Sequence, residues 1–252
     1  MIKNVLFVST LTLSGSVLSL QAATLSGTAF QIAEQGVNLT TEGTLDWALW
    51  DSTTSTAVSS KDFTNSQNGG AGIISAITAV DGNGTYTSVR GVTGASQTYT
   101  YTDGTSPVSQ TDATAGFVIN SKLDSLNIGV GLTISGAVGQ MYEVDIWTSG
   151  FRSRGELTAS LNGASDIVLL SRIFGDVGAS KESSRFTISF MPDSESDVLN
   201  LSYLMVGDSG TSAHTGIQAV AVRAVPEPST FALLLGAAGM LAAINRRSRR
   251  SK

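Results

Sequence analysis

The sequence of 252 residues has no cysteine and one histidine, and 14% of its residues are charged. Without cysteine, the chain has no disulfide framework, no cysteine-ligated zinc, no iron–sulfur cluster and no thiol nucleophile. A single histidine excludes multi-histidine metal sites and leaves His214 as the one candidate for a serine–histidine–aspartate triad. His214 lies in a loop-like segment and lacks a Gly-x-Ser-x-Gly partner, so we expect it to be exposed to solvent.

Basic residues are scarce in the body of the chain. Between Ala23 and Val225 there are nine Lys or Arg residues against 19 Asp or Glu residues, a net charge of −10. Such a surface repels anionic polymers and favours solubility or the uptake of divalent cations. The sequence therefore predicts no nucleic-acid partner and no cofactor, and leaves Ca²⁺ open as a bound ion.

The N-terminus has the three parts of a secretory signal peptide. Lys3 precedes an apolar stretch from Val5 to Leu20, and small residues follow around Ala22. This order of charged, apolar and small residues predicts that residues 1–22 form a signal peptide that is removed by cleavage after Ala22. The protein is therefore expected to be exported.

The C-terminus combines a proline-containing motif, an apolar segment and a basic tail. As a helix, the 15 residues from 230 to 244 would be about 22 Å long at the usual rise per residue. That is shorter than the hydrocarbon core of about 30 Å, so we expect only a transient anchor in the inner membrane. The motif consists of Val225, Pro226, Glu227, Pro228 and Ser229. The arginines that hold the tail in the cytoplasm are Arg246, Arg247, Arg249 and Arg250.

This three-part signal, which covers residues 225–252, resembles the PEP-CTERM sorting signal of Gram-negative bacteria. The resemblance implies processing near the motif by an exosortase-type membrane protease. It also implies delivery to the cell surface or to an extracellular exopolysaccharide matrix, as in a biofilm. An ordinary C-terminal anchor helix is the alternative and would leave the topology unchanged.

Alternation of apolar and polar residues dominates the second half of the body. The clearest stretches are 142–147, 186–190 and 199–205, and no segment has helical periodicity. About eight to ten short strands predict an all-β fold, a single jelly-roll-type β-sandwich over residues 23–224. Residues 51–113 are polar and rich in turn residues, so this part is expected to be loop-rich.

Several strings of the body resemble a secreted galactose-binding-like β-sandwich module. They include the segments 44–50, 99–107 and 155–161. The resemblance implies a glycan-associated accessory or adhesive role and carries over no catalytic residues.

Two clusters of aromatic and acidic residues are the candidate glycan-binding sites. Glu143, Asp145 and Trp147 project from one side of a strand whose other side is apolar. An aromatic ring stacks on a sugar face while carboxylates accept hydroxyl protons. Trp47 and Trp50 face opposite sides of an upstream strand, so at least one of them is expected to be free to stack. The alternative for the first cluster is a solvated outer face with a partly covered Trp147, and the alternative for the second is structural packing.

The function with the most support at this point is a non-enzymatic structural or glycan-binding role. A secreted glycoside hydrolase or polysaccharide lyase is the alternative, because Glu143 and Asp145 are spaced for glycosidase chemistry. Asp81 and Asn83 are weak candidates for Ca²⁺ ligands. An EF-hand loop starting at Asp81 would place Val92 where a glutamate is needed, so we expect a hairpin turn there instead.

Overall fold

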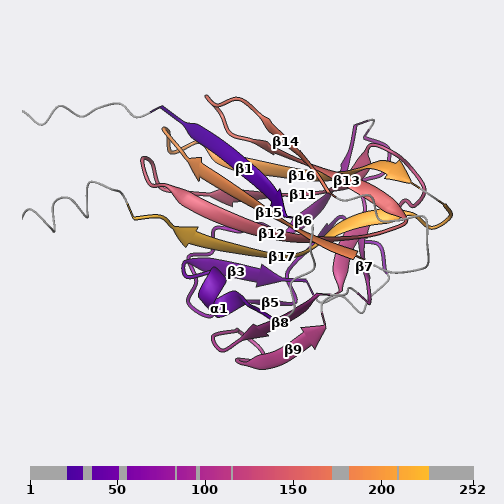
Figure 1. Cartoon of the computed structure of the whole chain (residues 1–252), viewed down its shortest axis with the longest axis horizontal. Coiled ribbons are helices and arrows are strands. Elements are labelled where there is room, and N and C mark those ends of the chain that lie inside the picture. The colour runs from indigo at the N-terminus through magenta and orange to yellow at the C-terminus, as the bar shows by residue number, and fades with distance from the viewer. Residues whose placement is uncertain are drawn as a thin grey trace, which may run out of the picture.

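A computed structural model describes residues 22–30, 36–50, 56–82, 84–94, 97–114, 116–171, 182–208 and 210–226. Within them the chain forms three β-sheets and one short helix (Figure 1). The eight-stranded sheet contains β1 (Thr24–Phe30), β3 (Asp46–Leu49), β5 (Asn65–Ser66), β7 (Val89–Val92), β10 (Phe117–Asn120), β12 (Tyr142–Phe151), β15 (Glu182–Met191) and β17 (His214–Ala224). The six-stranded sheet contains β4 (Ser60–Lys61), β6 (Ile77–Asp81), β11 (Ile128–Ser135), β13 (Ser153–Ser160), β14 (Ile167–Leu170) and β16 (Val198–Asp208). The three-stranded sheet contains β2 (Val37–Asn38), β8 (Thr98–Tyr101) and β9 (Gln110–Thr114), and the helix is α1 (Leu39–Glu42).

The strands from β10 to β17 pass back and forth between the two larger sheets. The eight-stranded sheet takes four of them in the order β15-β12-β17-β10, and the six-stranded sheet takes the others in the order β14-β13-β16-β11. All these neighbours pair antiparallel. This is the connectivity of a jelly roll, so the predicted all-β sandwich is confirmed.

The space between the two larger sheets holds the main hydrophobic core. Alternate side chains of the long strands point into it, among them Val144 on β12, Phe186 on β15 and Leu201 on β16. Burial of such apolar surface is the dominant favourable contribution to folding. The alternation seen in the sequence therefore identified this face of each strand correctly.

A third layer covers the outer face of the eight-stranded sheet, and the sequence did not predict it. Helix α1 and the three-stranded sheet lie against β3, β12 and β17 (Figure 1). The side chains enclosed between them form what we call the second core. Its members are Val37, Leu39, Trp47, Leu49, Tyr99, Tyr101, Trp147, Ala219 and Ala221.

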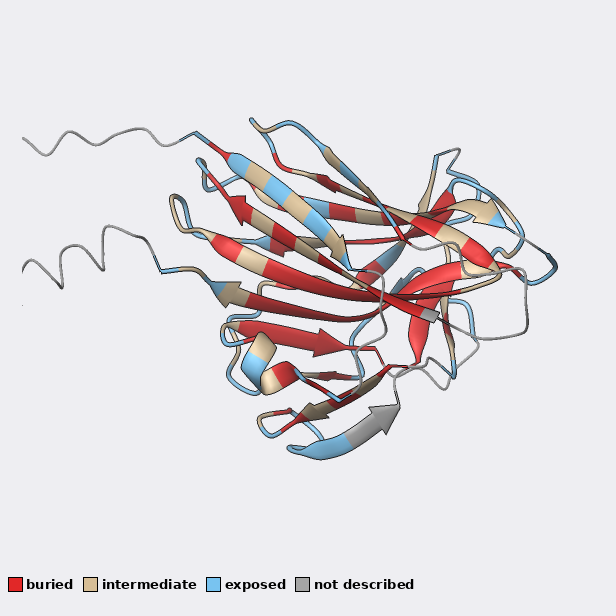
Figure 2. Ribbon diagram, in the orientation of Figure 1, coloured by how far each residue is buried: buried red, intermediate tan, exposed pale blue. Residues whose placement is uncertain are grey.

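The central strands β12 and β17 are consequently buried on both faces. They are red along most of their length in Figure 2. Two alanines of β17 make room for the large rings, since Ala219 lies opposite Trp147 and Ala221 lies opposite Trp47 in the strand register. In the second core the rings of Tyr99 and Trp147 meet edge to face, with centroids 6.0 Å apart.

Residues 51–113, expected to be loop-rich, contribute short strands to all three sheets. The turn predicted at Asp81 to Gly84 is present, because the Gly84 nitrogen donates to the Asp81 carbonyl at 3.0 Å. It is not a hairpin turn, because the strands that it connects, β6 and β7, belong to different sheets. Residues 51–55 lie outside the described part of the chain.

Replacement of Trp147 by alanine tests whether the outer face is sealed. Trp147→Ala should lower the free energy of unfolding by about 3–5 kcal/mol, because it leaves a cavity in the second core. Tyr86→Ala, at a residue that is 39% exposed, is the control and should cost less than about 1 kcal/mol. Urea denaturation measures both, and equal small losses would contradict a buried Trp147.

Candidate functional site

The three tryptophans lie inside the protein. Trp47, Trp50 and Trp147 are 0%, 0% and 1% exposed. Trp47 and Trp50 do point to opposite faces of their sheet, as expected, but Trp50 enters the main core and Trp47 enters the second core. Because the third layer covers the outer face, neither ring is free to stack on a sugar, and that expectation was wrong.

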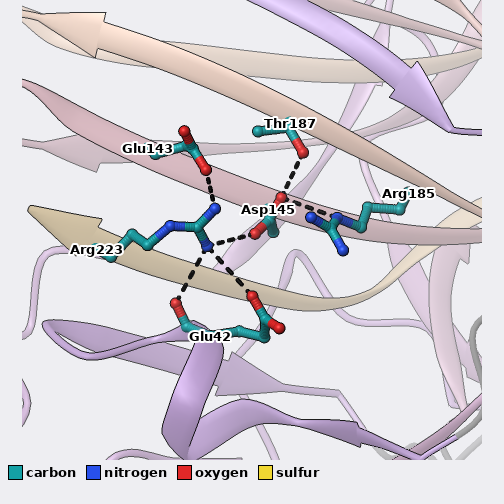
Figure 3. A network of polar contacts seen from close by, with 6 residues as sticks. All are labelled: Glu42, Glu143, Asp145, Arg185, Thr187 and Arg223. Atoms are coloured by element: carbon teal, nitrogen blue, oxygen red, sulfur yellow. Dashed lines mark hydrogen bonds and ion pairs between the residues drawn. The ribbon is translucent and has the colours of Figure 1, made fainter. Parts of the chain in front are cut away.

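The carboxylates of Glu143 and Asp145 belong to a network of ion pairs on the outer face of the eight-stranded sheet (Figure 3). The Arg223 guanidinium on β17 pairs with Glu143, directly opposite it in the register, and donates to Asp145 Oδ2 at 2.6 Å. Arg185 on β15 donates to Asp145 Oδ1 at 3.0 Å, and the Thr187 hydroxyl donates to the same oxygen at 2.5 Å.

Arg223 also reaches the helix. Its Nη1 lies 3.3 Å from Glu42 Oε2 at the end of α1. The network therefore joins β12, β15 and β17 to the third layer at the margin of the second core. Cross-strand pairs of opposite charge stabilise a sheet, and the link to Glu42 extends that effect to the covering helix.

Asp145 is the centre of the network, and its side chain is fully buried. Burial is the largest influence on this carboxyl and raises its pKa above the usual value of 3.8, although Thr187 and Arg185 act in the opposite direction. Its three donors satisfy the carboxylate within the protein. The arrangement holds elements together and leaves Asp145 without a face from which to meet a ligand.

A second carboxylate, Asp103, fixes the third layer. Its Oδ1 accepts hydrogen bonds from the Thr40 hydroxyl at 2.5 Å and from Trp47 Nε1 at 3.0 Å. Its Oδ2 accepts one from Gln67 Nε2 at 2.9 Å. Burial raises the pKa of Asp103, but these three donors outweigh it and hold the pKa below the usual value of 3.8.

Asn65 likewise holds the loop between β8 and β9 in place through its hydrogen bonds. Its Oδ1 accepts from the backbone nitrogen and the hydroxyl of Thr105, both at 2.9 Å. Its Nδ2 donates to the Tyr101 hydroxyl at 2.8 Å and to the Pro107 carbonyl at 3.0 Å. These contacts join positions about 40 residues apart, and no local motif signals them.

The weak calcium candidates fall in a turn. Asp81 Oδ2 accepts hydrogen bonds from the backbone nitrogens of Thr85 and Tyr86 at 2.8 and 2.9 Å. Asn83 lies outside the described residues. Across the described ranges, no group of three or more His, Cys, Asp or Glu side chains could hold a metal ion. Asp81 thus has a structural partner in the backbone of its own turn.

His214 does not lie in an exposed loop. It begins β17 and is half-buried, with its ring stacked between Phe117 and Phe151 at centroid distances of 5.5 Å each. Its Nδ1 lies 2.6 Å from the Ser212 carbonyl oxygen. The prediction that His214 is exposed to solvent was wrong, because two flanking rings partly cover the imidazole.

An open groove of about 510 Å³ crosses the outer face of the six-stranded sheet, over β6, β11, β13 and β16. No residue of the sequence analysis pointed to it. The polar side chains that line it are uncharged, and they are Ser75, Thr78, Thr133, Thr158, Ser160, Asn200 and Ser202. They alternate along their strands with side chains of the main core, such as Leu132 and Leu201.

Gly131 deepens the floor of this groove. A side-chain carbon at this position would lie 2.7 Å from the Leu201 carbonyl oxygen and 2.8 Å from Val80 Cγ2. Ser75 forms part of one wall, because its hydroxyl accepts from the Thr133 nitrogen at 2.8 Å. The recess is therefore built by a missing side chain on β11 and a loop tied to the same strand.

The start of the predicted sorting motif is attached to the folded body. Val225 donates its N–H to the Met141 carbonyl at 2.8 Å and accepts from Gln140 Nε2 at 2.9 Å. Pro226 follows and is exposed. The start of β1 and the end of β17 lie at the same end of the sandwich (Figure 1).

The other residues of the targeting segments lie outside the described part of the chain. These are residues 1–21 of the expected signal peptide, Glu227, Pro228 and Ser229 of the motif, the apolar segment 230–244 and the four arginines of the tail. In the portion that is described, no helix has the length and apolar character needed to cross a membrane.

The pH dependence of stability tests the hydrogen bonds that Asp103 accepts from Thr40, Trp47 and Gln67, which we call the Asp103 clamp. Because its pKa is lower in the folded state, its contribution is present above pH 4 and is lost as the pH falls through the folded value. Asp103→Asn should cost about 1–3 kcal/mol at pH 7 and much less at pH 2. Asp62→Asn, at an exposed carboxylate, is the control for urea denaturation at both pH values. A loss that is the same at both would contradict an ionised clamp.

Two comparisons with known proteins bear on this chain. A search of curated proteins found no match. Residues 224–250 match the family model of the PEP-CTERM protein-sorting motif, which confirms the sorting signal expected at residues 225–252. The motif indicates an exported protein that passes through a membrane-anchored intermediate and is sorted to the cell surface or extracellular space by an exosortase.

Proposed function

We propose that the body of this protein is a non-enzymatic glycan-binding module, exported to the cell surface or to an extracellular polysaccharide matrix. The groove on the six-stranded sheet is its binding site, and a neutral polysaccharide is its ligand. The observation that carries the proposal is the groove itself, an open recess of about 510 Å³ lined by hydroxyl and amide side chains.

The chemistry of the lining favours a neutral sugar chain. Hydroxyl and amide groups both donate and accept hydrogen bonds, which suits the many hydroxyls of a saccharide. The methyl groups of the threonines, with Ala76 and Val80, offer apolar contact to the ring faces. An open groove accommodates an internal stretch of a long polymer, whereas an enclosed pocket would accept only an end.

The charge of the body argues against an anionic polymer. The body carries a net charge of −10, and the polar groove side chains carry none. An acidic polysaccharide would be repelled by the surrounding surface without meeting a cation in the groove. The galactose-binding-like resemblance of the sequence supports the same class of ligand.

The paired carboxylates support a non-enzymatic role. Glycoside hydrolysis needs two carboxyl groups that flank the scissile bond. Asp145 is buried beneath three donors, and Glu143 is paired with Arg223. Both groups also lie on the eight-stranded sheet, whereas the groove lies on the six-stranded sheet.

Affinity electrophoresis with dextran, galactomannan and alginate tests the proposal. We expect a neutral polysaccharide to retard the protein and alginate to have no effect. Thr158→Ala combined with Asn200→Ala should weaken the retarding interaction about 10- to 30-fold, because each lost hydrogen bond contributes about 1 kcal/mol. Ser26→Ala with Thr28→Ala, at exposed positions on β1, is the matched control.

Two outcomes would contradict the proposal. One is equal retardation of the groove variant and the control, which would place binding elsewhere. The other is release of reducing sugar from a neutral polysaccharide, abolished by Glu143→Gln and unaffected by the groove variant. That result would favour the alternative of a secreted glycoside hydrolase.

A further inference from the structure

The backbone nitrogen of Ala23, the first residue of the expected processed chain, lies beside a carboxylate. The Ala23 nitrogen donates to Asp193 Oδ2 at 3.2 Å. Ala23 is only 9% exposed and belongs to the main core, whereas Ala22 before it is exposed. The exposed Ala22 and the buried Ala23 thus lie on either side of the expected cleavage site.

The position of Asp193 is fixed by the turn between β15 and β16. The buried carboxylate of Asp197 accepts from the backbone nitrogens of Asp193 and Ser194 at 3.1 and 3.2 Å. Gly163, with φ at +78°, packs on the other side, where a side-chain carbon would lie 3.5 Å from Ala23 Cβ. Asp193 forms no ion pair with any Lys or Arg of the described residues.

We propose that removal of the leader after Ala22 creates an ion pair between the new α-ammonium group of Ala23 and Asp193. This ion pair would add to the pairing of β1 with β15 and would exist only in the processed protein. Water hydrolyses the Ala22–Ala23 peptide bond. Its oxygen joins the Ala22 carbonyl carbon to give a carboxylate, and the Ala23 nitrogen takes up protons to become an ammonium. The hydrogen bond from an uncharged amide to the carboxylate then becomes an ion pair in which both partners are charged.

The surroundings of Ala23 favour the charged amine. The titratable groups of the two segments that border it are Asp193, Glu195 and Asp197 in the turn and Asp166 in the loop after β13. All are acidic, so they favour the charged form of the amine and oppose burial, which favours the neutral form. The ion pair stabilises the folded state where the amine is protonated and is lost as the pH rises and the amine loses its proton.

The inference rests on the proposed export of the protein, and the experiment separates the two. The full chain is expressed with its own leader in a bacterial host and purified in detergent, and mass spectrometry identifies its first residue. The α-amine is then labelled with ¹³C-methyl groups and titrated by NMR. We expect a chain that begins at Ala23, with an amine pKa about 0.5–1 higher than in Asp193→Asn.

Glu195→Gln is the matched control, because Glu195 is an exposed carboxylate of the same turn, whereas the carboxylate that accepts from the Ala23 nitrogen is that of Asp193. The amine pKa of Glu195→Gln should stay close to that of the wild type and above that of Asp193→Asn. An equal amine pKa in the wild type and in Asp193→Asn would overturn the ion pair. Cleavage at any other bond would also overturn it. Neither result would contradict export of the protein. A chain that retains Met1 would overturn export and the ion pair together.

Discussion

Closure of the outer face of the eight-stranded sheet is the constraint on which the rest of this structure depends. Strands β12 and β17 are buried from both sides, so every outward side chain near their centre must pack or find a polar partner within the protein. Trp47 and Trp147 satisfy this by packing on small alanines of β17. Asp145 satisfies it through arginine and threonine donors.

The charged side chains follow from the same constraint. Asp103, Arg223 and Glu42 lie where the third layer meets the sheet, and each connects an element of the layer to a strand beneath it. These charges hold the covering layer in place. Over the groove of the six-stranded sheet the described residues form no such covering layer, and uncharged hydroxyl and amide side chains line the open recess.

The features that could be predicted from the sequence are those set by residues close together in the chain. Alternation at 186–190 and 199–205 identified the side of each strand that enters the main core, and the sorting motif could be recognised because its parts follow one another along the chain. Alternation could not show whether the opposite side is solvated or covered, so Trp147 was placed on the surface. The covering layer is held by contacts such as that of Asn65 with Thr105, between polar residues in a stretch that resembles a loop.

The most direct test of the closed face is the environment of the tryptophans. The chain has three, and all are buried in the structure. We expect the native protein to have blue-shifted tryptophan emission that acrylamide quenches only weakly, and both properties should change together on unfolding. Emission typical of an indole in water from the folded protein, quenched readily by acrylamide, would show an open outer face and contradict this account.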